Sequence, residues 1–215
     1  MTKVFLVLFF IVSIGDLLNV WFELPYRHLT KSLIIPMLTL YFIASSPKVK
    51  SFYPFVLALF FAWLGDVFLL FSGTKFFLLG LGGFLIMQGI YSFIFLKERD
   101  SQPGKSLITA MMLGFFSIGF NYYLWPFTTE IRVTVIVYSI AIAIMAFAGI
   151  SRGKSLHGYN FVFIGVILFV ISDTVLAINS FADGIWNGGS IVMLTYILAQ
   201  FFIVEGYSKH LRSSV

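Results

Sequence analysis

The feature that most constrains this chain is a succession of long apolar stretches joined by short polar connections. Eight stretches of about 20 mostly apolar residues follow one another. At a rise of about 1.5 Å per residue, such a segment crosses the hydrocarbon core of a bilayer as an α-helix. We therefore predict an all-α polytopic membrane protein, a single domain over residues 1–215, with transmembrane helices over 4–22, 30–45, 52–71, 75–96, 107–125, 132–150, 159–180 and 188–207.

Composition agrees with this interpretation. Only 11% of the residues are charged and 60% are hydrophobic, whereas soluble domains carry about 25% charged residues. The chain has no cysteine, which excludes disulfides, thiolate nucleophiles and cysteine zinc sites. Its net charge of +5 does not by itself indicate a nucleic-acid partner, and no obligatory protein partner is evident.

The distribution of basic residues predicts the orientation. Ten of the 14 basic residues fall on the side of the amino terminus, which the positive-inside rule assigns to the cytoplasm. An even number of spans then puts both termini inside, in a multi-pass protein of the bacterial inner membrane. The first stretch is predicted to be a retained helix and not a signal peptide, because Asp16 interrupts it and no small-residue cleavage motif follows.

Three aspartates fall inside predicted spans, where an ionisable side chain costs at least about 2.5 kcal/mol and marks a functional candidate. Asp16, Asp66 and Asp173 each follow a small residue, on helices that all run from inside to outside. The helical rise places each roughly 7–11 Å from the outer end of its helix. The glycines before Asp16 and Asp66 predict close helix approach.

Other polar side chains approach the same layer, which predicts a polar cavity in the outer half of the bundle. We expect it to bind substrate. The alternative is structural: each aspartate hydrogen-bonds a Tyr or Asn on another helix, and Lys31 merely reaches the interface. The candidate substrate-binding residues are Asp16, Lys31, Gln88, Asn121, Tyr138, Tyr196 and Gln200.

The residues that are absent narrow the chemistry. The three histidines, His28, His157 and His210, lie in or beside predicted loops, so a zinc site is not expected. Two carboxylates alone leave Mg²⁺ or Ca²⁺ possible in principle. No G-x-S-x-G elbow occurs. Acid–base catalysis by paired carboxylates is what remains, with Asp66 and Asp173 as the pair.

Taken together, the motifs resemble those of the YhhN-type membrane proteins, whose characterised members are lysoplasmalogenases. The resemblance runs nearly end to end, and its most specific parts are the two aspartate motifs on the third and seventh spans. It is carried by Thr30-Lys31, Pro36, Gly65-Asp66-Val67-Phe68-Leu69-Leu70, Gly83-Phe84, Tyr91, Tyr138, Met145, Gly165, Phe169, Ser172-Asp173, Phe181, Tyr196 and Gln200.

The resemblance implies hydrolysis of the vinyl ether bond of lysoplasmalogen, a lysophospholipid. This reaction begins with proton transfer to carbon, so we expect neither a cofactor nor a metal. Gln88 stands where the family often has His, and Ser32 where a Pro commonly follows the Lys. A glutamine does not transfer a proton as a histidine does. The alternatives are a proton-coupled lipid or small-molecule transporter, a different lysolipid hydrolase, and a lysolipid-binding protein that has lost catalysis.

Overall fold

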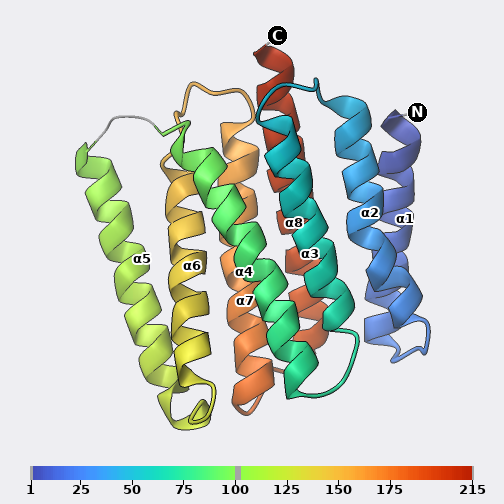
Figure 1. The fold of residues 1–215 in the computed structure, drawn as a ribbon. Coiled ribbons are helices and arrows are strands. Elements are labelled where there is room, and N and C mark those ends of the chain that lie inside the picture. Colours follow the sequence, from blue (N-terminus) through green and yellow to red (C-terminus); the bar gives the residue numbers. More distant parts are fainter. Residues whose placement is uncertain (1, 100–102, 215) are drawn as a thin grey trace.

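The computed structural model describes residues 2–99 and 103–214, and this part of the chain forms a bundle of α-helices that run alternately up and down (Figure 1). The predicted all-α fold is confirmed. Within the described residues, seven helices are long and apolar enough to cross a membrane, and α3 is a shorter apolar helix. The helices are α1 (Thr2–Trp21), α2 (Arg27–Ser45), α3 (Phe52–Phe68), α4 (Thr74–Leu96), α5 (Pro103–Leu124), α6 (Arg132–Ile150), α7 (Tyr159–Phe181) and α8 (Gly188–Ser213), with a 3-10 turn, η1 (Trp125–Phe127), after α5.

Some helices begin or end at residues other than the predicted ends of the spans, because an apolar stretch and the helix that contains it need not stop at the same residue. Helix α8 continues past the predicted end at 207 to Ser213, because charged residues end a span by hydropathy without ending the helix. Helix α3 stops at Phe68, before the predicted 71. Helix α5 already begins at Pro103, ahead of the predicted span over 107–125, while residues 100–102 lie outside the described part of the chain.

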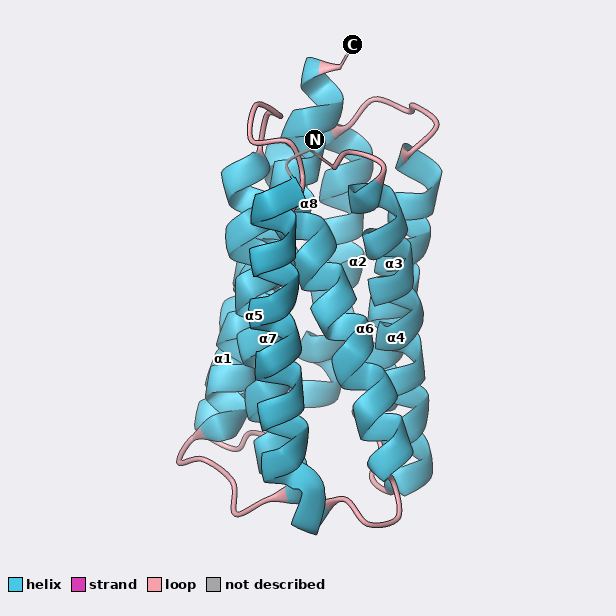
Figure 2. Ribbon diagram, turned by 90° about the vertical axis from the view of Figure 1, so that its left-hand side faces the viewer, coloured by secondary structure: helices cyan, strands magenta, loops and turns pink. Residues whose placement is uncertain are grey.

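The helix pairs that pack together trace a ring, with one helix outside it. Helices α1, α2, α3, α4, α6, α7 and α8 each contact the next in this order, and α8 returns to α1 and α2. Helix α5 packs on α6, at the edge of the bundle (Figure 1). Both termini lie at the same end, and Figure 2 shows the bundle turned by 90°. The cytoplasmic assignment of that end remains a prediction from charge.

Glycine brings α3 and α4 close together beside Asp66. A Cβ atom on Gly83 would lie 2.9 Å from the backbone nitrogen of Gly65 and from the carbonyl oxygen of Phe61. Only a residue without a side chain allows this approach. Gly15, by contrast, faces Thr30 at an ordinary contact distance of 3.5 Å. Close approach is therefore required beside Asp66 and not beside Asp16.

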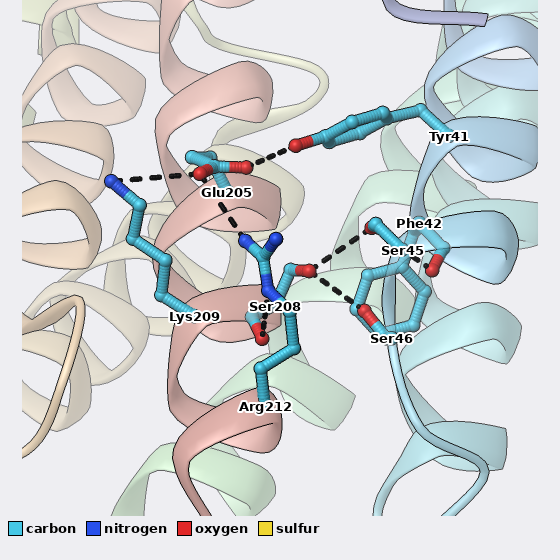
Figure 3. A network of polar contacts seen from close by, with 8 residues as sticks. All are labelled: Tyr41, Phe42, Ser45, Ser46, Glu205, Ser208, Lys209 and Arg212. Carbon is cyan, nitrogen blue, oxygen red and sulfur yellow. Dashed lines mark hydrogen bonds and ion pairs between the residues drawn. The ribbon is translucent and has the colours of Figure 1, made fainter. Parts of the chain in front are cut away.

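A network of polar side chains ties α2 to α8 (Figure 3). It lies near the carboxyl ends of both helices, at the end of the bundle that carries the termini (Figure 1). The Tyr41 hydroxyl donates to Glu205, which also pairs with Lys209 at 3.5 Å and with Arg212 at 3.4 Å. The Ser46 hydroxyl donates a hydrogen bond of 2.9 Å to the Ser208 hydroxyl. These bonds give the Tyr41 hydroxyl and the Glu205 carboxylate polar partners on neighbouring helical turns and helices.

Candidate active site

Asp66 lies where three helices converge. It sits on α3 and is 1% exposed. The hydroxyl of Tyr196, on α8, donates a hydrogen bond of 2.7 Å to Oδ2 of Asp66. The ammonium of Lys31, on α2, lies 3.8 Å from Oδ1. Asp66 thus has a hydroxyl donor on one oxygen and a buried cation near the other.

Asp173 has a different environment. It sits on α7, and the hydroxyl of Tyr138, on α6, donates a hydrogen bond of 2.9 Å to its Oδ2. The amide of Gln88, on α4, reaches the same oxygen at 3.4 Å, a long and weak contact. No ion pair to Asp173 forms within the described part of the chain. The partners of Asp173 are thus neutral, whereas Asp66 has a cation beside it.

Both aspartates line one cavity of about 500 Å³, here called the polar cavity. The cavity reaches the starts of α2 and α8, at the end of the bundle opposite the termini (Figure 1). Its polar lining includes Arg27, Lys31, Asp66, Ser172, Asp173 and Tyr196. A molecule in this cavity therefore meets two carboxyl groups in unlike settings, with two basic side chains nearby.

Comparison with known proteins identifies the family. The YhhN family model matches residues 26–207, which include both aspartates and all their partners. The chain belongs to the YhhN family. This confirms the resemblance inferred from the aspartate motifs.

This YhhN-family chain is similar to lysoplasmalogenase TMEM86B of Sus scrofa. It is 32% identical over 136 residues, a match that covers 62% of this chain and 54% of the pig protein. The chain thus spans little more than half the length of that relative. No solved structure matches the chain significantly.

Asp16, a predicted binding residue of this YhhN-family protein, lies at the interface of α1 and α2. It is fully buried, and the Thr30 hydroxyl donates a hydrogen bond of 2.8 Å to its Oδ1. The Asn19 amide donates in turn to Thr30 at 3.2 Å. Asp16 does not line the polar cavity. Its contacts fit the structural alternative, a polar tie between two neighbouring helices.

Gln200 and Asn121 were also predicted to bind substrate, and the structure brings neither to the polar cavity. Gln200 is fully buried and accepts a hydrogen bond of 3.3 Å from the Tyr91 hydroxyl. Asn121, on α5, donates a hydrogen bond of 2.7 Å to the hydroxyl of Ser139 on α6. Each residue faces a neighbour outside the polar cavity, because the position of a residue along a helix does not determine the direction of its side chain.

Asn179 is a cavity residue that the sequence interpretation missed. It lies on α7 and lines the polar cavity, and its side-chain oxygen accepts a hydrogen bond of 2.8 Å from the backbone of Ile185. An amide near the end of α7, six residues after Asp173 on the same helix, was the available signal. Among the described residues, no three His, Cys, Asp or Glu side chains gather as metal ligands would.

Proposed function

We propose that this protein hydrolyses the vinyl ether bond of lysoplasmalogens with an ethanolamine or choline headgroup, releasing a fatty aldehyde and a glycerophospho-headgroup. The observation that carries the proposal is that Asp66 and Asp173 face one cavity, with a cation beside only the first. The name of the pig relative supports the choice of substrate. The proposed location is the bacterial inner membrane.

Hydrolysis of a vinyl ether requires two carboxyl groups in opposite protonation states. A protonated acid must deliver a proton to the alkene carbon, which produces an oxocarbenium ion. A charged carboxylate must stabilise that cation and then activate water. The same division of labour operates in glycoside hydrolysis, whose transition state is also oxocarbenium-like.

The surroundings suggest which aspartate takes which role. Each aspartate accepts a hydrogen bond from a tyrosine hydroxyl, and only Asp66 also has a cation beside it, Lys31, which stabilises its charged form. Asp173 is 7% exposed and has neutral partners. We therefore assign Asp173 as the acid and Asp66 as the carboxylate.

The proton balance closes over one turnover. Asp173 protonates the alkene carbon farther from the ether oxygen and becomes charged. Water attacks the other alkene carbon, which is bonded to the ether oxygen, while Asp66 takes a proton from the water. The product of this step is a hemiacetal. Asp66 then protonates the departing glycerol oxygen as Asp173 removes the hemiacetal proton. The carbon–oxygen bond breaks, the aldehyde forms, and both aspartates return to their starting states.

Recognition of the phosphate is assigned chiefly to Arg27. Lys31 is 5% exposed and pairs with Asp66, so part of its charge is already compensated. Arg27 is exposed at the start of α2 and lines the same cavity. A guanidinium suits phosphate because it donates two parallel hydrogen bonds. The lipid phosphate would then lie at the outer interface, with the ether linkage deeper in the bundle.

The test is aldehyde release by the purified protein in detergent from lysoplasmenyl-ethanolamine, with saturated alkyl-ether and acyl lysolipids alongside. Aldehyde from the vinyl ether alone is expected, because only this substrate forms an oxocarbenium ion by protonation at carbon. Asp66→Asn and Asp173→Asn should each abolish release while the proteins still elute as folded species. Wild-type-like turnover by either variant would overturn the acid–base assignment.

Two further results would redirect the assignment. Fatty acid release from the acyl lysolipid would indicate a different lysolipid hydrolase. Proton-coupled flux in vesicles without any product would indicate a transporter, in which intramembrane carboxylates commonly relay protons. We also expect EDTA to leave aldehyde release unchanged. Loss of activity with EDTA and its recovery with a divalent ion would require a metal in the mechanism.

A further inference from the structure

A second cavity, here called the apolar groove, lies between α4, α5, α6 and α7. Its hydroxyl groups already have partners within the protein. Ser139 donates to the Ile136 carbonyl at 2.9 Å, Thr174 donates to the Val170 carbonyl at 2.7 Å, and Ser117 donates to Ser139 at 3.3 Å. What the groove offers a ligand is therefore mostly hydrocarbon surface, including Phe116, Phe120, Ile142, Ala143, Ala177 and Phe181.

The apolar groove and the polar cavity meet at Asp173. Three residues, Phe77, Asp173 and Leu176, line both. A ligand that occupies both spaces must be amphiphilic, with its charged part beside Arg27 and Lys31 and its apolar part between α5 and α7. The bond that joins the two parts would lie beside the Asp173 carboxyl group.

Helix α5 forms the outer wall of the apolar groove. It lies outside the ring of helices and packs on α6 (Figure 1). Much of its remaining surface, such as Phe115, Ile118 and Tyr122, is exposed and apolar, as expected of a face toward lipid. The groove has a volume of about 50 Å³, which is small for a long hydrocarbon chain. Since α5 packs chiefly on one neighbour, it is the wall that moves at least cost.

We propose that the apolar groove binds the hydrocarbon chain of a single-chain phospholipid whose phosphate lies in the polar cavity, and that α5 moves outward to admit the chain. The inference rests on the proposed function for the position of the vinyl ether, which it sets beside Asp173. The occupant is the single-chain lysolipid of the proposed function.

The first experiment narrows the groove from two walls. The measured quantity is kcat/KM for an 18-carbon alkenyl lysolipid divided by kcat/KM for an 8-carbon one. Ala143→Phe on α6 and Ala177→Phe on α7 should each lower this ratio by at least about tenfold. A loss of about 1.4 kcal/mol of contact energy gives that factor. Ala110→Phe, the same change at an exposed site on α5 outside the groove, is the matched control and should leave the ratio unchanged. An unchanged ratio in both groove variants would overturn the proposal.

The second experiment measures binding without turnover. A saturated alkyl-ether lysophosphoethanolamine with a diazirine in its chain is photolysed with Asp66→Asn protein in detergent, and the labelled peptides are mapped. Labelling concentrated on groove residues of α5, α6 and α7, and reduced by Ala143→Phe, supports the proposal. Labelling spread evenly over the exposed faces of all helices overturns it. Groove labelling together with no aldehyde release by the wild-type protein would support chain binding while overturning the proposed hydrolysis.

Discussion

The hydroxyl of Tyr196 on α8 donates a 2.7 Å hydrogen bond to Oδ2 of Asp66 on α3, across a separation of 130 residues in the chain. Both side chains line the polar cavity. The bond holds one carboxylate oxygen, while Lys31 faces the other at 3.8 Å. The orientation of Asp66 toward the cavity thus depends on two helices other than its own.

We predict that Tyr196→Phe lowers kcat for aldehyde release by about 10- to 100-fold, because a hydrogen bond to a charged group contributes about 1.5–3 kcal/mol. The fold should persist, since the phenyl ring keeps its contact with Phe84. Tyr53→Phe, an exposed tyrosine on α3, is the control and should behave as wild type. Equal rates for Tyr196→Phe and wild type would show that this hydroxyl does not act on the reaction.

Lys31→Met should destabilise the protein through Asp66. Removal of one partner from a buried ion pair costs about 3–5 kcal/mol, because the remaining charge is left uncompensated. We therefore expect a clearly lower Tm in detergent for Lys31→Met. The double variant Lys31→Met/Asp66→Asn should regain much of that loss, since it buries no unpaired charge. Additive losses in the double variant would show that the two side chains do not stabilise each other.

Gln88 is expected to position Asp173 through its amide donor. Gln88→Leu removes the donor and should lower kcat/KM by up to about tenfold, the upper range for one neutral hydrogen bond. Gln88→His retains a donor at the same site and should preserve most of the activity. The check is the KM-against-kcat split of both variants, together with the pH profile. Only Gln88→His adds a group that titrates near neutral pH. A Gln88→Leu protein with wild-type kinetics would contradict a positioning role.

Stability at low pH should depend on Glu98, which follows α4 outside the spanning segment. Burial raises the pKa of Glu98, but a hydrogen bond from His210 and the charge of Arg152 outweigh burial and hold it below its ordinary value of 4.5. Arg152 donates to Glu98 at 2.7 Å, and His210 lies 3.1 Å from it. A lowered pKa in the folded state stabilises the protein above pH 4.5, and this contribution is lost as the pH falls below that value.

The measurement is Tm in detergent between about pH 6 and pH 3, the range that brackets the ordinary pKa of Glu. Glu98→Gln should lower Tm at pH 6 and flatten its decline toward acid. Glu23→Gln, at an exposed site, should follow the wild-type curve. If Glu98→Gln declined as steeply as wild type, the acid sensitivity would belong to other carboxyl groups.

Hydropathy alone was enough to predict most of this architecture. Each apolar stretch had to become a helix, because hydrocarbon offers no partner for a free backbone N–H or C=O. The same argument marked Asp66 and Asp173, since a carboxyl group in that environment is costly without a purpose. Depth along the membrane normal followed from counting residues at a fixed rise.

The tertiary structure decided which of these polar side chains meet. Asp16, Asn121 and Gln200 were all expected to bind substrate, yet they bond to Thr30, Ser139 and Tyr91 and not to one another. A helix that is apolar on every face carries little periodic signal for its rotation about its own axis. That rotation is set by packing against neighbours, such as the close approach of α3 and α4 at Gly65 and Gly83. The sequence by itself therefore determined the spans and the depth of the carboxyl groups, while only packing decided that Asp66 and Asp173 share a cavity.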